Sequence, residues 1–214
     1  MIATPLGLLA GGGLVLLVAV LIGLGPRRLL TQVEQRTPSP PVGLWLTLAA
    51  AGAGLAAFAG ACAYGEPAQA WRLGVVAACL AGVLVFDARY LVIPDLYVLL
   101  LALVALSGIE QVGWLRAGLG AMLGGGLLYG VRALFQRFRG VEGLGLGDVK
   151  LMAALGGLVG PERVLWIIIT AASLGAAWIG LRRKAALAGQ VVAPFGAAAA
   201  APGLVVFALS RLTS

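Results

Sequence analysis

Long apolar runs recur along almost the whole chain and limit what it can fold into. Eight such runs, separated by short polar segments, cover residues 5–25, 43–64, 71–86, 96–109, 114–135, 148–160, 163–181 and 190–209. A membrane-spanning helix needs about 20 mostly apolar residues, so the runs at 96–109 and 148–160 extend into flanking residues or form short buried helices. Hydrophobic residues make up 61% of the chain and charged residues 11%, which excludes an ordinary soluble domain. We therefore predict an all-α, polytopic transmembrane bundle of about eight helices, with six as the lower bound.

Positive charges are distributed unevenly between the two sides of such a bundle. If the first run is a retained helix with its N-terminus outside, 11 of the 15 Lys and Arg residues fall on the cytoplasmic side. Cytoplasmic loops of membrane proteins carry an excess of these residues, so the count favours this orientation. The net charge of +7 is scattered between apolar runs without a basic stripe. We expect a lipid bilayer around the chain and no nucleic-acid partner.

The sequence contains few residues that could bind a metal ion. The chain has no histidine, and its two cysteines, Cys62 and Cys79, lie apart in apolar runs. Zinc sites need clustered Cys and His ligands. We predict no metal site and no cofactor. The same lack of histidine excludes a Ser-His-Asp triad, and no phosphate-binding loop is present.

Three of the eight acidic residues stand out by their positions. Asp87 follows the run at 71–86, at the C-terminal end of a predicted helix, where the macrodipole disfavours a carboxylate. Asp95 and Asp148 each precede an apolar run, and a helix N-cap is the structural alternative for both. In the orientation given above, Asp87 and Asp148 reach the same cytoplasmic boundary of the membrane.

Two carboxylates brought within hydrogen-bond reach are suited to hydrolysing an amide. They cannot both ionise cheaply, so one of them keeps a proton. The ionised member takes a proton from water while the protonated member polarises the carbonyl. Ionisable groups at membrane depth are rare and usually functional. We therefore interpret Asp87 and Asp148 as a candidate catalytic pair.

Glycines precede Asp148 in the tetrapeptide Gly145-Leu146-Gly147-Asp148. They allow backbone conformations that side chains exclude, and they let a substrate strand come close. Alone, a Gly-x-Gly-Asp string is weak evidence in a chain with 33 glycines. Most other glycines have a structural explanation: the small-xxx-small pairs Gly120 with Gly124 and Gly126 with Gly130 predict close helix packing.

Three segments carry a resemblance to a known family. Residues 86–95 read FDARYLVIPD, an aspartate followed by an Ile-Pro-Asp turn that includes Pro94 and Asp95. Residues 145–156 read GLGDVKLMAALG, a GxGD motif that includes Gly145, Gly147, Asp148 and Lys150. The third segment is Pro194-Phe195-Gly196. In this order they resemble the motifs of the type IV prepilin peptidases, the A24-type GxGD intramembrane aspartyl proteases.

The resemblance implies an aspartic endopeptidase without a cofactor. Such an enzyme cleaves the short basic leader of a prepilin or pseudopilin, which continues into a hydrophobic helix, after a glycine at the cytoplasmic face of the bacterial inner membrane. Asp87 and Asp148 match the catalytic pair of the family. Asp95 and Lys150 match supporting positions, where we expect Asp95 to cap the helix that begins at Leu96 and Lys150 to lie at headgroup level.

The resemblance also suggests a division of the chain. We expect N-terminal membrane helices and a short cytoplasmic linker in residues 1–72, and the catalytic membrane core in residues 73–214. Many members of the family also methylate the new N-terminus and carry paired CxxC motifs near the first helix. The linker at residues 26–42 has no cysteine, so the chain resembles the compact members, in which methyltransferase activity is doubtful.

Two alternatives remain open from the sequence. Presenilin-like proteases share a GxGD aspartate, but their partner motif is Tyr-Asp within a helix, whereas here Phe86-Asp87 leads into an Ile-Pro-Asp turn. A polytopic transporter or assembly scaffold would use Asp87 and Asp148 to bind cations or protons, and it would cut no peptide bond.

Overall fold

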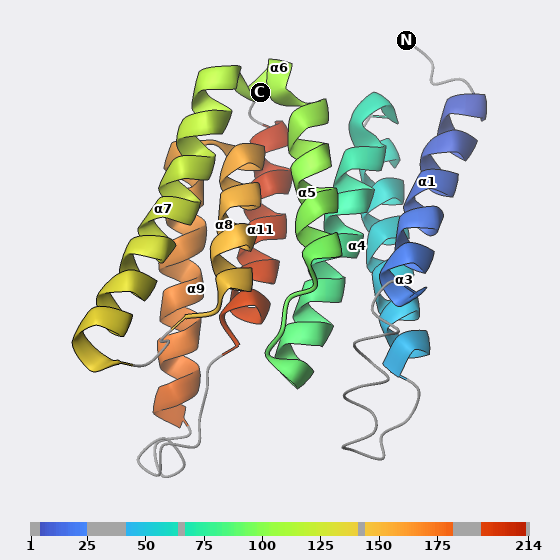
Figure 1. The fold of residues 1–214 in the computed structure, drawn as a ribbon. Helices are drawn as coiled ribbons and strands as arrows, with labels where there is room; N and C mark the ends of the chain where they lie inside the picture. Colours follow the sequence, from blue (N-terminus) through green and yellow to red (C-terminus); the bar gives the residue numbers. More distant parts are fainter. Residues whose placement is uncertain (1–4, 25–41, 64–66, 141–143, 182–193, 213–214) are drawn as a thin grey trace. The chain divides into compact units, whose positions relative to one another are not determined.

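The computed structural model describes residues 5–24, 42–63, 67–140, 144–181 and 194–212, and every regular element in these ranges is an α-helix. The all-α prediction is therefore confirmed. The predicted linker at 26–42 lies outside the described residues except for Val42. The helices are α1 (Pro5–Leu24), α3 (Val42–Ala63), α4 (Pro67–Tyr90), α5 (Asp95–Ser107), α6 (Ile109–Val112), α7 (Trp114–Arg139), α8 (Leu146–Val159), α9 (Pro161–Leu181) and α11 (Phe195–Leu212) (Figure 1).

Each of the eight predicted apolar runs corresponds to one of these helices, although the start of the last run lies outside the described residues. Within those residues, three stretches are long and apolar enough to cross a membrane: Ala70–Tyr90, Trp114–Phe138 and Pro161–Leu181. The short helix α6 was not predicted. It lies between Gly108 and Gly113, and Gly113 has a positive φ of 87°, a conformation that side chains disfavour.

The chain forms two compact units, Met1–Val85 and Phe86–Ser214. In the first unit α1 packs on α3. A side chain added at Gly54 would meet the side chain of Val15 and the backbone carbonyl of Gly74. Small residues therefore allow α3 and α4 to approach each other closely, as is common between membrane helices.

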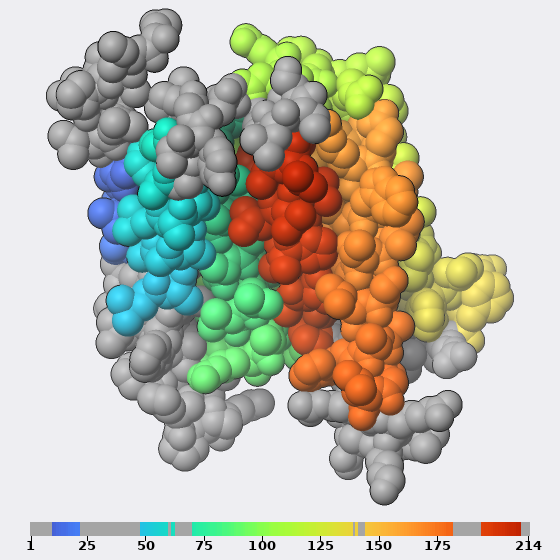
Figure 2. Space-filling model, turned by 180° about the vertical axis from the view of Figure 1, so that it is seen from behind, coloured from blue at the N-terminus to red at the C-terminus, as the bar shows by residue number. Residues whose placement is uncertain are grey.

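Helix α8 is the centre of the second unit. It contacts α5, α7, α9 and α11, which surround it in Figure 1. The face of the unit seen in Figure 2 shows α11 lying alongside α9. Eight of the 14 residues of α8 are buried, and they form an unbroken block from Ala154 to Val159 preceded by Leu151 and Met152. The run at 148–160 is therefore a short helix buried by its neighbours, one of the two outcomes expected for it.

Helices α7 and α8 come closest where glycines face each other. A Cβ added at Gly120 would collide with the backbone of Gly156, and one at Gly124 with the carbonyl of Met152. The predicted close packing is thus confirmed for Gly120 and Gly124. It is wrong for Gly126 and Gly130, which have no described atom within 4 Å of such a Cβ. Gly126 lies six residues after Gly120, which is about one and two-thirds helical turns. Gly126 therefore faces away from α8.

Candidate active site

Three segments far apart in the sequence meet at one end of the second unit (Figure 1). They are the last turn of α4, the first turn of α8 and the first turn of α11, which carry Asp87, Asp148 and Gly196. The Asp87 side chain is buried, with its residue 4% exposed, and its Oδ2 accepts a hydrogen bond of 2.8 Å from the N–H of Ala197. The N–H of Gly196 faces both carboxyl groups. The structure therefore brings the two aspartates together with the Pro-Phe-Gly segment.

The start of α11 accounts for the position of Asp87. A carboxylate at the C-terminal end of its own helix faces the negative end of the macrodipole. Here, however, the carboxylate points at the start of another helix, where backbone N–H groups lack intrahelical partners and the dipole is positive. Asp87 thus joins the end of α4 to the start of α11 across 110 residues of sequence.

Asp148 is the third residue of α8 rather than its N-cap. The helix begins at Leu146, with Gly145 as the N-cap in an extended conformation. The carboxyl group turns back toward the N–H of Gly145 and lies close enough to Asp87 for their charges to repel. Its Oδ1 is buried without a hydrogen-bond partner among the described residues. Buried acceptors normally have a partner, so this enclosed oxygen is left with unused hydrogen-bonding capacity.

Ile93 lies between the two helix starts and was not singled out from the sequence. Helix α4 ends at Tyr90, and Leu91 adopts a left-handed conformation with φ of 54° that turns the chain. Ile93 is 7% exposed. A Cβ added at Gly147 would lie 3.1 Å from the Ile93 Cβ, and one at Gly196 would meet the end of the same side chain. These glycines therefore leave room for Ile93.

Asp95 and Lys150 form an ion pair between the two aspartate motifs. The Lys150 Nζ lies 2.8 Å from the Asp95 Oδ1, with side-chain exposures of 51% and 76%. The prediction that Asp95 caps a helix beginning at Leu96 is wrong: α5 begins at Asp95 itself, its N-cap is Pro94, and no side-chain cap bond forms. The carboxylate instead binds a cation 55 residues away.

The remaining motif residues shape the segments around this site. Pro94 is buried, and its backbone φ of −64° leads into α5. Pro194 precedes α11, and its carbonyl accepts a hydrogen bond of 3.1 Å from Ala198. Phe195, the first residue of α11, is half-buried. Gly145 is exposed at the start of α8.

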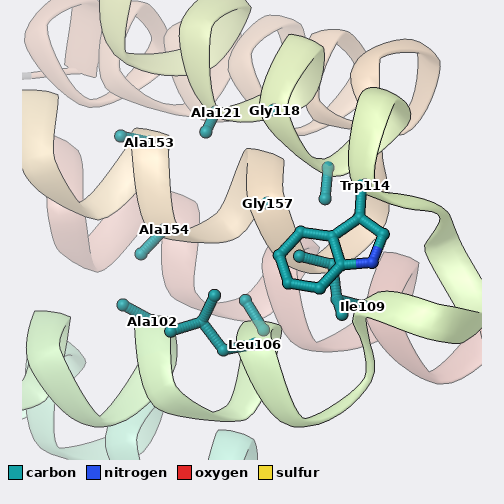
Figure 3. A pocket seen from close by; sticks show the side chains of 11 residues that line it. Ala102, Leu106, Ile109, Trp114, Gly118, Ala121, Ala153, Ala154 and Gly157 are labelled. Atoms are coloured by element: carbon teal, nitrogen blue, oxygen red, sulfur yellow. The ribbon is translucent and has the colours of Figure 1, made fainter.

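A separate cavity of about 390 Å³ lies among α5, α6, α7 and α8. Figure 3 shows that Leu106, Ile109 and Trp114 line one part of it and small residues of α7 and α8 the other. No charged residue lines this cavity, and Asp87, Asp95 and Asp148 lie outside its lining. Its apolar walls offer no group for acid–base chemistry, so the candidate active site remains the carboxylate pair.

Comparison with known proteins points to the same region. The model of the type IV leader peptidase family matches residues 74–180, a range that includes Asp87, Ile93 and Asp148. A prepilin leader peptidase/N-methyltransferase of Xanthomonas campestris pv. campestris is 33% identical over 156 residues, which are 65% of this chain and 53% of that protein. A protein of the same name from Burkholderia pseudomallei is 46% identical over 68 residues, 31% of this chain and 22% of that protein.

The extent of these matches is limited. The chain spans about half the length of the Xanthomonas relative and less of the Burkholderia one. No solved structure matches the chain significantly.

Proposed function

The chain belongs to the type IV leader peptidase family, and on this premise we propose that it is an aspartic endopeptidase that removes the leader of a prepilin or pseudopilin. The observation that carries the proposal is the meeting of Asp87 and Asp148 beside the start of α11. Two buried or half-buried carboxylates whose charges repel each other are hard to explain by stability alone, because each would be better solvated or paired with a cation.

The chemistry follows from the proximity of two acids. One carboxyl group keeps its proton, because two adjacent carboxylates repel each other. The ionised group takes a proton from a water molecule, and the water oxygen attacks the carbonyl carbon of the scissile peptide bond. The protonated group donates a hydrogen bond, then its proton, to the carbonyl oxygen. As the tetrahedral intermediate collapses, one of its hydroxyl groups returns a proton to the carboxylate of the pair, the C–N bond breaks, and the protonated member gives its proton to the leaving amine.

The rest of the site supports this role. The first turn of α11 directs N–H groups at the pair and holds Asp87 in place. The buried Oδ1 of Asp148 lacks a partner among the described residues, which suits an atom that binds water or substrate. The exposed Gly145 leaves space for an extended substrate strand to approach.

We extend the proposal to the substrate and the location. The substrate is a precursor with a short basic leader followed by a hydrophobic helix, cut after a glycine. The site faces the cytoplasm from the bacterial inner membrane. N-methyltransferase activity, which the names of the relatives include, is not part of the proposal. The cysteines of this sequence are Cys62 and Cys79, and they form no CxxC motif.

Leader removal in cells tests the proposal. We expect Asp87→Asn and Asp148→Asn each to abolish processing of a co-expressed prepilin, seen as loss of the shorter product on a gel, at wild-type levels of membrane-inserted enzyme. Asparagine keeps the shape and hydrogen-bonding capacity of the side chain but cannot exchange a proton in this way.

Glu110→Gln is the matched control, because Glu110 is an exposed acid on α6. It should process the substrate like the wild type. Full processing by Asp148→Asn would refute the aspartate mechanism. A wild-type chain that leaves every prepilin uncut, yet changes proton or cation flux through the same aspartates, would favour the transporter alternative.

A further inference from the structure

Arg132 of α7 is a buried cation in an apolar helix. It lies within the candidate span Trp114–Phe138 and is only 9% exposed, whereas Arg137 on the same helix is exposed. The charge distribution explains both arginines as residues that orient the helix in the membrane. That explanation does not require burial, and arginine is seldom buried without a specific partner.

The guanidinium of Arg132 contacts the segment that leads to the candidate active site. Its Nη1 donates a hydrogen bond to the backbone carbonyl of Leu144. Leu144 precedes Gly145, the N-cap of α8, and lies four residues before Asp148. The Arg132 side chain thus links the C-terminal part of α7 to the start of the GxGD motif.

Such a tie matters because the motif is rich in glycine. Gly145 and Gly147 have a wide choice of backbone conformations, so the segment needs contacts from outside to hold one of them. The Asp148 carboxyl group has one such contact with the backbone N–H of Gly196, in the first turn of α11. A charge-assisted hydrogen bond is stronger than a neutral one, and the planar guanidinium fixes its direction better than a lysine ammonium does.

We propose that Arg132 is a positioning residue for proteolysis: it fixes the Leu144–Gly145 backbone and thereby the place of the Asp148 carboxyl group. The inference rests on the proposed function. A catalytic group displaced by about 1 Å can lose roughly a hundredfold in rate. In this role Arg132 acts through the backbone of the segment that leads to Asp148 and exchanges no proton with the substrate.

The test compares purified Arg132→Met, Arg132→Lys and Arg137→Met in detergent or nanodiscs with a prepilin substrate. We expect Arg132→Met to lower kcat about tenfold to a hundredfold with little change in KM, and Arg132→Lys to restore part of the loss. Arg137→Met should match the wild type. Amide hydrogen exchange should rise in residues 144–148 of Arg132→Met.

The outcomes separate this inference from the proposed function. If Asp148→Asn is inactive while Arg132→Met keeps wild-type kcat, the positioning role is wrong and the proposed function stands. If Arg132→Met does not fold, Arg132→Lys decides: a folded protein with lowered kcat and unchanged KM supports the role, and wild-type kcat overturns it. A rise in KM with unchanged kcat would also overturn the positioning role.

Discussion

At the scale of single residues, the ion pair between Asp95 and Lys150 joins the two aspartate motifs at a solvent-exposed position. Exposed pairs contribute little, about 0.2–1 kcal/mol. We therefore expect Asp95→Asn and Lys150→Gln each to lower the free energy of unfolding by less than about 1 kcal/mol while processing of prepilin continues at a reduced rate. The measurement is thermal unfolding in detergent beside the gel assay of leader removal.

A charge swap sharpens this prediction. In Asp95→Lys with Lys150→Asp, the pair is rebuilt with its charges reversed, so the double variant should recover part of what either swap loses alone. A double-mutant cycle isolates that coupling. Strict additivity of the two losses would show that the pair has no role. Complete inactivity of Asp95→Asn at wild-type stability would assign Asp95 to the chemistry instead.

Some residues of the site could be predicted from the sequence and others could not. Asp87 attracted attention because a carboxylate at the end of a helix needs an explanation, and the motifs paired it with Asp148. Its hydrogen bond to Ala197 joins residues 110 positions apart in the sequence. Local sequence patterns cannot predict a contact at that separation. The role of Ile93 could not be predicted for a related reason, because in the sequence a buried isoleucine in a turn resembles any core residue. Only the structure shows that Gly147 and Gly196 lie against it.

At the scale of elements, glycine contacts between α7 and α8 hold together the core that presents Asp148. A Cβ at Gly156 would collide with the backbone carbonyl of Gly120, and a backbone group cannot move aside as a side chain does. We expect Gly156→Ala to lower the free energy of unfolding by about 1–3 kcal/mol and to reduce the yield of folded protein, as followed by thermal unfolding in detergent.

Gly126→Ala is the matched control on α7, where an added Cβ meets no described atom within 4 Å. It should be neutral or stabilising by up to about 1 kcal/mol, since alanine is the better helix former. Equal destabilisation by both variants would show that α7 and α8 do not meet as described. The GxxxG spacing identified both glycine pairs, but only the rotation of α7 against α8 decides which pair is at the interface.

At the scale of the whole molecule, hydropathy predicted the helices well because a chain in lipid must satisfy its backbone hydrogen bonds within each segment. The orientation across the membrane rests on charge alone, with 11 cations expected on the cytoplasmic side and four outside. The two ends of α7 offer a direct measurement. Arg137 is exposed near the end that leads to Leu144 and the site, and Glu110 is exposed on α6 near the other end.

Single cysteines at these positions report the orientation. In a Cys62→Ala, Cys79→Ala background, we expect a membrane-impermeant maleimide to label Glu110→Cys in spheroplasts and Arg137→Cys only in inside-out vesicles. Retained processing by both variants shows that the fold survives the substitutions. The opposite pattern would place Asp87 and Asp148 at the outer face. A basic leader that stays in the cytoplasm could not then reach them, so the labelling tests whether enzyme and substrate meet on the same side of the membrane.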